Sequence, residues 1–440
     1  MKSYKIIVFF IAIITLHSCG KDKVEPEEII EPVLIFPELV TYEASDIKPI
    51  SVKLGFSVTN QHNADIFEVG LIVGYEPGLT YDNNTSRILL PWDVSADYYM
   101  TLENLPEDNI TIYVNSYAIN PNGIGYGNEI SFNNLGNKTH GAIELNNQEE
   151  VNAFGSEGYN TITGNLELSG NITDLSPLSD LYSVSGLNVT NTQLLNFEGL
   201  NKLERIRGDF NVSNNHLLNN FQGVNNLTEI SSVFRIESND NLTTLSGLDN
   251  LNAAGTIIIR QNPILNNLNG LESTTFVPYV GLYFNPLLSN VEAIKNLETL
   301  KGIIIEGNNS LTALPIFENI VDISTVDIGY NTSLNNLTAF QNVTNIALLE
   351  LFQSNVTSLE GLNSLTYLGI LKLNQNEYIT SLNGLESLST SNTIQINYNP
   401  NLADFCALNN LFTNGSIGTY GVEFNAINPT EEDIINGNCN

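Results

Sequence analysis

The side chains best suited to binding chemistry stand at equivalent places of a pattern that repeats through the middle of the chain. Arg235, Arg260, Tyr279 and Tyr283 each lie next to one of two apolar residues separated by a single position. In a strand, that alternation places them on the face opposite the apolar residues. Recognition surfaces are enriched in arginine, which offers directed charged hydrogen bonds, and in tyrosine, which offers a large planar area. The predicted ligand-binding set is Arg235, Ile258, Arg260, Tyr279, Tyr283, Ile304, Glu306 and Phe352. Ordinary variation of an exposed face fits these residues equally well.

Residue patterns typical of catalysis are missing from the sequence. It contains no zinc-binding His-Glu-x-x-His, no phosphate-binding Gly-x-x-x-x-Gly-Lys and no Ser-His-Asp arrangement in a credible context. Paired carboxylates arise by chance among 48 Asp and Glu residues, so they do not indicate glycoside hydrolysis. We therefore expect no enzyme activity, no cofactor and no metal site.

The N-terminus has the pattern of an export signal. Lys2 and Lys5 precede the apolar run 6–16, which is too short to span a bilayer but fits the apolar part of a secretory signal. Leu16-His17-Ser18-Cys19 resembles the lipobox of bacterial lipoproteins, and the resemblance implies removal of residues 1–18 and acylation of Cys19. A secretory signal cut elsewhere is the alternative. The acidic, Pro-containing segment 19–37 is predicted to be an extended tether.

The charged stretch Gly20-Lys21-Asp22 resembles the one that sends lipoproteins of Bacteroidota-type bacteria to the outer face of the outer membrane. This resemblance implies an outer membrane lipoprotein that faces the cell exterior, attached to lipid through Cys19. If Cys19 is acylated, Cys406 and Cys439 remain as one pair in an oxidising compartment. We expect a disulfide between them, because the four His residues that could activate a thiol are far away in sequence.

Composition limits the possible partners. The 440 residues include 16 Lys and Arg against 48 Asp and Glu, which gives a formal net charge of -32. Nucleic acids and anionic membrane surfaces are held by basic residues, so neither is an expected partner. Any attachment to a membrane would therefore be covalent. With 42% apolar residues, the chain is able to bury a large core.

Residues 38–134 show short apolar alternations such as Val52-Leu54-Phe56, separated by Pro, Gly and Asn, which indicate half-buried strands. Asn120-Pro121-Asn122-Gly123 is predicted to be a turn followed by a hairpin. The segment resembles fibronectin type III-like modules, whose last hairpin carries a similar pattern, and this implies a β-sandwich that acts as a spacer. The matching residues are Tyr117, Ala118, Asn120, Gly123, Tyr126, Gly127 and Asn128.

From Gly164 onward, a pair of apolar residues flanking one variable residue recurs every 21 to 24 residues, from Leu166/Leu168 to Ile394/Ile396. Apolar residues about three apart follow each pair, which predicts a coil that turns repeatedly around one core. We expect about 11–12 stacked coils. Val422 and Phe424 are candidates for a twelfth rung.

An asparagine stands three residues before the first of these later apolar positions in most coils, and stacked amides of this kind bond the backbone of neighbouring turns. The predicted structural ladder comprises Asn191, Asn215, Asn239, Asn262, Asn285, Asn308, Asn331, Asn376 and Asn399. The pattern resembles leucine-rich repeats, and together with Ile162, Gly164, Asn165 and Leu166 it resembles receptor L domains over 140–440. Asn147 with Glu150 predicts a capped helix before the first rung.

These inferences predict a mainly β protein composed of a signal peptide (1–18), a tether (19–37), a fibronectin type III-like sandwich (38–134) and a receptor L domain-like solenoid with a C-terminal cap (140–440). The resemblances imply a surface-anchored, non-catalytic protein for adhesion or ligand capture, with an unknown extracellular protein or glycan as its partner. A structural protein of the cell envelope or matrix, and an accessory glycan-binding lipoprotein for nutrient uptake, remain alternatives.

Overall fold

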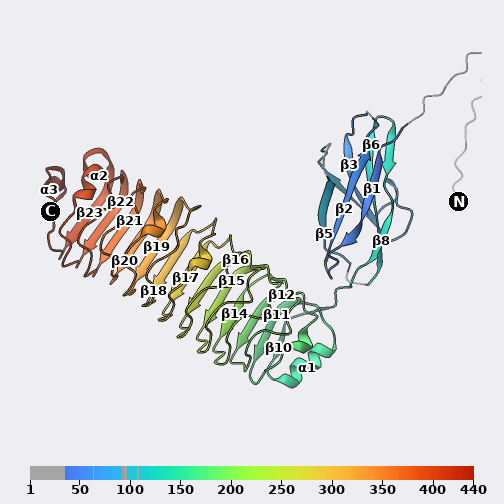
Figure 1. The fold of residues 1–440 in the computed structure, drawn as a ribbon, viewed down its shortest axis with the longest axis horizontal. Coiled ribbons are helices and arrows are strands. Elements are labelled where there is room, and N and C mark those ends of the chain that lie inside the picture. The colour runs from blue at the N-terminus through green and yellow to red at the C-terminus, as the bar shows by residue number, and fades with distance from the viewer. Residues whose placement is uncertain (1–34, 63, 92, 94–96, 107–108) are drawn as a thin grey trace, which may run out of the picture. The chain divides into compact units, whose positions relative to one another are not determined.

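The computed structural model describes residues 35–440 except 63, 92, 94–96 and 107–108 (Figure 1). The predicted signal peptide, Cys19 and most of the tether lie outside the described residues. The chain forms two compact units, the second of which contains residues 132–440 together with the segments Ala44–Lys53 and Thr101–Thr111. No helix in the described part is long and apolar enough to cross a membrane.

The N-terminal strands form two sheets, one with the order β1-β2-β5 and one with the order β4-β3-β6-β7, in which β8 also pairs with β6. Alternation buries Val52, Leu54 and Phe56, as the sequence predicts. The Asn120 side chain accepts hydrogen bonds from the backbone of Asn122 and Gly123, which closes the predicted hairpin. The bounds are β1 Glu38–Ser45, β2 Ser51–Asn60, β3 Glu68–Gly74, β4 Ser86–Leu90, β5 Asp97–Glu103, β6 Thr111–Asn120, β7 Gly123–Tyr126 and β8 Ile130–Asn133.

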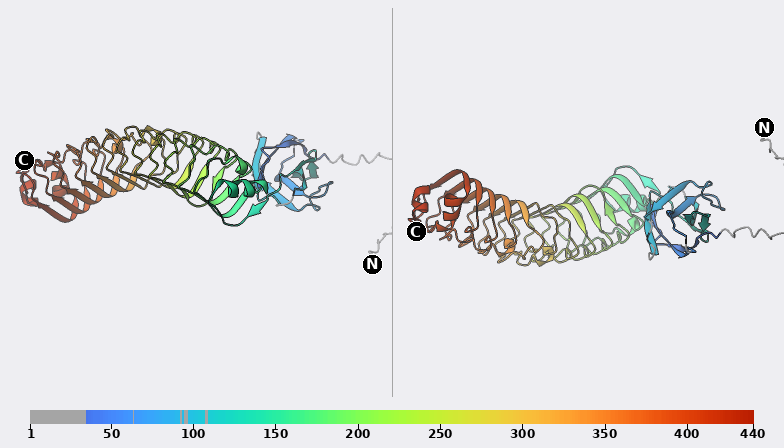
Figure 2. Two further views of the ribbon diagram at one scale, coloured as in Figure 1. Left: turned by 90° about the horizontal axis from the view of Figure 1, so that it is seen from below. Right: turned by 90° about the horizontal axis from the view of Figure 1, so that it is seen from above.

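The rest of the chain is a β-solenoid of about 12 turns whose strands pair in parallel into one sheet (Figures 1 and 2). Its strands are β9 Thr139–His140, β10 Ile143–Leu145, β11 Thr161–Ser169, β12 Ser183–Thr190, β13 Arg205–Ile206, β14 Phe210–Ser213, β15 Glu229–Glu237, β16 Ala253–Arg260, β17 Tyr279–Tyr283, β18 Gly302–Glu306, β19 Asp322–Gly329, β20 Asn345–Phe352, β21 Tyr367–Asn374, β22 Thr390–Asn397 and β23 Ser416–Glu423. The helices are α1 Gln148–Ser156, α2 Asn409–Asn414 and α3 Glu431–Ile435, with 3-10 turns η1 Ser176–Leu178, η2 Glu292–Ile294, η3 Thr338–Phe340 and η4 Cys406–Leu408.

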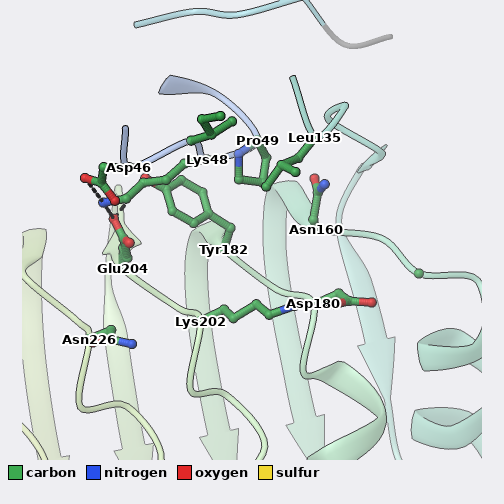
Figure 3. A pocket seen from close by; sticks show the side chains of 12 residues that line it. Asp46, Lys48, Pro49, Leu135, Asn160, Asp180, Tyr182, Lys202, Glu204 and Asn226 are labelled. Atoms are coloured by element: carbon green, nitrogen blue, oxygen red, sulfur yellow. Dashed lines mark hydrogen bonds and ion pairs between the residues drawn. The ribbon is translucent and has the colours of Figure 1, made fainter. Parts of the chain in front are cut away.

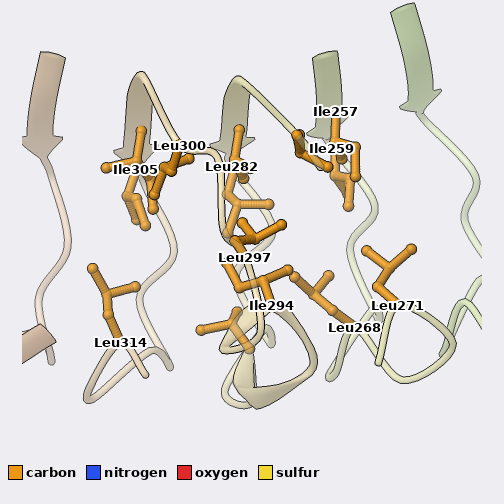
Figure 4. Packing of buried hydrophobic residues seen from close by; sticks show 14 of the residues in the cluster. Ile257, Ile259, Leu268, Leu271, Leu282, Ile294, Leu297, Leu300, Ile305 and Leu314 are labelled. Atoms are coloured by element: carbon orange, nitrogen blue, oxygen red, sulfur yellow. The ribbon is translucent and has the colours of Figure 1, made fainter. Parts of the chain in front are cut away.

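The core of the solenoid lies between the strands and the returning loops of each coil. Ile257 and Ile259 of β16 and Leu282 of β17 face loop residues such as Leu268 and Leu297 (Figure 4). All five are buried. Because each coil covers the core of its neighbours, stability depends on contacts between successive coils, and the ends need caps.

The asparagine ladder runs along the inside of the coils. Asn285 is representative: its Oδ1 accepts from the backbone N of Asn262 at 3.1 Å, and its Nδ2 donates to the carbonyl of Ile259 at 3.0 Å. The fully buried ladder residues are Asn215, Asn239, Asn262, Asn285, Asn308, Asn331, Asn376 and Asn399. Asn425, which the pattern missed, accepts from the backbone N of Asn399 at 3.1 Å and extends the ladder into the last coil.

The prediction for Asn191 is wrong. Asn191 is exposed, and the neighbouring Thr192 is buried and donates to Asn215 Oδ1 from both its backbone N and its hydroxyl. The ladder position lies three residues after the second apolar residue of each strand, which is residue 192 in this coil. The loop here is one residue shorter before Leu194, so counting back from Leu194 led to the wrong residue.

The residue just before the ladder position has a left-handed backbone in successive coils. These residues are Asn191, Asn214, Ser238, Gln261, Phe284, Gly307, Tyr330, Gln353, Gln375, Tyr398 and Phe424, with φ between 47° and 66°. The left-handed backbone turns the chain sharply away from the strand. Side chains at this position therefore project outward along one edge of the sheet, where Phe284 and Tyr330 are about half exposed.

Both ends of the solenoid are capped. At the N-terminal end, the Asn147 side chain accepts from the backbone N of Glu150 and starts α1. At the C-terminal end, the predicted disulfide Cys406–Cys439 is confirmed and lies against the last coil. A twelfth rung exists as β23, but its inward pair is Tyr420 and Val422, which align with Ile394 and Ile396. Phe424 takes the left-handed position and is exposed. The predicted inward pair, Val422 and Phe424, was therefore two residues too far along the chain.

Candidate binding surface

The predicted binding residues other than Phe352 lie on the outer face of four adjacent strands, β15 to β18. Register places Arg235 beside Ile258, then Gly281 and Ile304 in the middle row of this face. The row after it contains Glu237, Arg260, Tyr283 and Glu306, and the row before it contains Tyr279 and Gly302. We call these residues, with Val233 and Thr256, the β15–β18 face. Their inward neighbours, such as Phe234 and Ile259, are fully buried and hold the strands in position.

Two glycines leave space on this face for the tyrosine rings. A Cβ added at Gly281 would lie 2.5 Å from the Tyr283 ring, and one added at Gly302 would lie 2.7 Å from the Tyr279 ring. The rings therefore lie close above the backbone of β17 and β18. Larger residues at the two positions would force the rings away, so the glycines fix where the flat aromatic surfaces are.

Two adjoining hollows result from this arrangement. The first, of about 330 Å³, is lined by Arg235, Ile258, Arg260, Gln261, Tyr283 and Phe284. The second, of about 270 Å³, lies between Tyr279 and Tyr283 and is lined also by Ile258, Gly281, Gly302 and Ile304. Ile258 and Tyr283 line both, so the two hollows adjoin one another on the sheet.

The first hollow carries the positive charge of the face. Arg260 Nη2 lies 2.6 Å from Glu237 Oε1, which compensates one arginine. Arg235 makes no ion pair with any residue in the described part of the chain. The Nε atoms of both arginines are buried and have no hydrogen-bond acceptor. One positive charge is therefore left uncompensated in a chain whose formal net charge is -32.

The strands beyond the second hollow are acidic. Asp327 on β19 follows Ile304 in the middle row, and Glu350 follows it on β20. Burial, with the nearby carboxylates of Glu350 and Glu306, raises the pKa of Asp327 to about 6. Lys372 Nζ lies 3.2 Å from Glu350 Oε2 and opposes that shift. Burial also raises the pKa of Tyr283, with Glu306 and Asp327 contributing.

Among the predicted residues, Phe352 stands apart. It lies on β20, two strands beyond β18, and its ring packs against Tyr330 with the centroids 5.2 Å apart. The predicted binding set omits five residues of this region: Gly281, Gly302, Gln261, Phe284 and Asp327. The recurrence of Phe or Tyr directly before the ladder position, at Phe284, Tyr330 and Tyr398, is the signal that would have located the aromatic edge.

A larger hollow, of about 550 Å³, lies elsewhere in the second unit (Figure 3). Its charged groups already pair with one another: Lys48 Nζ lies 2.8 Å from Glu204 Oε2, and the Tyr182 hydroxyl donates to the same oxygen at 2.9 Å. These groups have less capacity for a ligand than Arg235, so the hollow is the weaker candidate.

Nothing in the described part of the chain resembles a metal centre, since it has no cluster of three or more His, Cys, Asp or Glu residues suited to a metal ion. Neither the protein-family models nor the curated protein sequences include a match to this chain. The arrangement of the β15–β18 face is therefore the main basis for a functional conclusion.

Proposed function

We propose that this protein is a surface-anchored, non-catalytic binding protein that captures an extracellular ligand on the β15–β18 face. One observation carries the proposal: two arginines and two tyrosines line adjoining hollows on the outer face of the sheet. Elsewhere the outward positions of the solenoid are mostly small polar and acidic residues. Aromatic and arginine side chains contribute most of the binding energy at recognition sites. A concave, partly apolar surface with few polar groups is the usual form of a ligand site.

The parts around this face complete the proposal. Acylated Cys19 anchors the chain to the outer leaflet of the outer membrane, and the tether holds the folded part away from it. The division of the N-terminal strands into β1-β2-β5 and β4-β3-β6-β7 supports a fibronectin type III-like spacer over 38–134. Parallel strands, an asparagine ladder and a capping helix support a receptor L domain-like solenoid over 140–440.

An array of glycans and extracellular proteins tests the proposal. The probe is the chain from residue 19 onward, with Cys19→Ser to prevent acylation. We expect a specific ligand whose binding falls at least tenfold with Tyr283→Ala. The matched control is Tyr378→Ala, because Tyr378 is an exposed tyrosine that lies away from this face, in the loop after β21. Equal binding by both variants would place the ligand elsewhere on the chain, and no ligand at all would favour the structural alternative.

A further inference from the structure

We infer that the ligand of the β15–β18 face is an acidic oligosaccharide, with a ring carboxylate held by Arg235 and Arg260 and a neighbouring sugar ring stacked in the tyrosine-lined hollow. This inference rests on the proposed function and specifies its substrate class. It begins with the uncompensated arginine. The Nε of Arg235 is buried, but its terminal Nη groups have no carboxylate partner in the described part of this strongly acidic chain and are left for an external anion. A planar guanidinium suits a carboxylate because the two form paired hydrogen bonds.

The surrounding charge sets the charge of that anion. Glu237 compensates Arg260, so the first hollow has a surplus of one positive charge. Glu306 lies on β18, beside Tyr283 of β17, and its negative charge disfavours a second negative charge on the ligand. A singly charged group therefore fits the hollow better than a doubly charged phosphate.

The second hollow fits a flat, partly apolar ring. The Tyr283 ring lies over Gly281 and the Tyr279 ring lies over Gly302, and Ile258 and Ile304 also line the hollow. A sugar ring presents an apolar face of C–H groups that packs against an aromatic ring, while its hydroxyls stay at the rim. The two hollows share Ile258 and Tyr283 in their linings. One oligosaccharide is therefore able to place its carboxylate in the first hollow and its stacked ring in the second.

The acidic strands beyond the hollow favour a sugar over a peptide. Glu306, Asp327 and Glu350 succeed one another across β18, β19 and β20. Ionised carboxylates only accept hydrogen bonds. Sugar hydroxyls are able to donate to all of them, whereas a peptide donates only through its N–H groups and leaves its carbonyl oxygens without a donor there. Strands lie about 4.8 Å apart, so the distance from Arg235 to Asp327 is about 19 Å, enough for several sugar units.

The test compares carboxylated, esterified and neutral oligosaccharides on the chain from residue 19 with Cys19→Ser. The probes are oligogalacturonate, oligoalginate and hyaluronan oligosaccharides, methyl-esterified oligogalacturonate, a neutral cello-oligosaccharide and an acidic tyrosine-containing peptide, each measured by titration calorimetry. We expect at least one carboxylated glycan to bind. Its neutral or esterified counterpart should bind at least tenfold more weakly, and higher salt should weaken binding of the acidic form.

Variants assign the binding to the proposed residues. Arg235→Ala should weaken binding of the acidic glycan at least tenfold. Lys295→Ala should leave it unchanged, because this variant removes the same charge from an exposed position directly after η2, away from the sheet. Glu237→Gln should strengthen binding severalfold, because it frees Arg260 for the ligand, and should not change binding of a neutral sugar. A purely structural role of these residues predicts no gain from Glu237→Gln.

The outcomes separate this inference from the proposed function. If a ligand depends on Tyr283 but binds the Arg235→Ala variant as well as the Lys295→Ala variant, the binding function stands and the acidic-sugar assignment is wrong. Equal affinity for acidic and esterified glycans, or tighter binding of the peptide than of every glycan, also overturns the assignment. If no carboxylated glycan binds at millimolar concentration, the assignment is rejected whatever the array finds. Thermal melts of each variant show whether a loss reflects unfolding.

Discussion

Replacing Asn285 with alanine should destabilise the solenoid far more than replacing an exposed asparagine of another coil. Asn285 Oδ1 accepts from both the backbone N and the Nδ2 of Asn262, at 3.1 and 3.2 Å. Its Nδ2 donates to the carbonyls of Ile259 and Tyr283 at 3.0 and 3.2 Å. The backbone N of residue 285 keeps its bond to Asn308 after the substitution. The loss therefore concerns only the bonds of the side chain.

The magnitude follows from the groups left without partners. The backbone N of Asn262 and the carbonyl of Ile259 both lose their side-chain partner inside the fully buried ladder. A buried group left unpaired costs about 1–3 kcal/mol, so the two together cost about 2–6 kcal/mol. We expect Asn285→Ala to lower the free energy of unfolding by about 4 kcal/mol.

Asn191→Gly is the matched control. Asn191 is exposed, and glycine readily adopts its left-handed backbone, which has φ of 56°. We expect a change within about 0.5 kcal/mol, which is usual for a surface substitution. Urea unfolding followed by circular dichroism measures both variants. Hydrogen exchange at the amide of Asn262 gives a local readout, which matters because repeat arrays do not always unfold in one step.

The two variants make the reasoning refutable. If Asn285→Ala and Asn191→Gly cost the same, the ladder bonds contribute no more than surface asparagines do. If Asn285→Ala destabilises the chain but leaves exchange at Asn262 unchanged, the loss arises from a cavity and not from the ladder bonds.

Further predictions concern the acidic strands, the cap and the anchor. Because the pKa of Asp327 rises from 3.8 to about 6 on folding, its stabilising contribution is complete below pH 3.8 and is lost as the pH rises through 6. The full shift corresponds to about 3 kcal/mol, but the carboxyl is partly open to water, which reduces the effect. In urea unfolding, Asp327→Asn should stabilise the chain by about 1 kcal/mol at pH 7.5 and should not change its stability at pH 3.5. The same stability difference at both pH values would refute this prediction. Cys406→Ser should lower the free energy of unfolding by about 3–4 kcal/mol under oxidising conditions, because the bridge spans 33 positions. A reducing agent should destabilise the parent chain equally. A melting temperature unchanged by both the substitution and the reducing agent would contradict a stabilising bridge. Cys19→Ser should abolish incorporation of labelled palmitate into cells expressing the chain, and retained label would mean that the lipid is attached elsewhere.

The regular part of the fold follows from the sequence because its signal is repeated. Leu166/Leu168 through Ile394/Ile396 recur at nearly constant spacing, so each rung supports the interpretation of the next. Errors arise where the spacing changes. Because the loop before Leu194 is shorter, counting back from Leu194 gave Asn191 in place of Thr192 as the ladder residue. The last rung, after which the repeat is no longer seen, was placed two residues too far along.

The β15–β18 face was predictable as a set of residues but not as a shape. Alternation places Arg235 and Tyr283 on the outer face, and register with neighbouring strands brings them together. The hollows depend on the absence of side chains at Gly281 and Gly302 and on the direction in which the tyrosine rings fold. Whether Arg235 has a partner depends on Glu237 pairing with Arg260 instead. Neither property belongs to a single repeat, so neither can be derived from the repeat pattern.

The asparagine ladder has a direction, and this makes the two ends of the solenoid unequal. The backbone N of Asn262 donates to Asn285, and that of Asn376 donates to Asn399, so these coils depend on the coil that follows them for an acceptor. Removing coils from the C-terminal end leaves backbone donors without their acceptor, whereas removal from the N-terminal end takes one acceptor from Nδ2 donors that keep another in their own coil, as Asn285 does with the carbonyl of Tyr283. The final coil meets this need with Asn425, whose own backbone N bonds to Asn428. Shortening the array from its C-terminal end is thus the more damaging of the two truncations, and a chain emerging from the ribosome completes each coil only when the next one arrives.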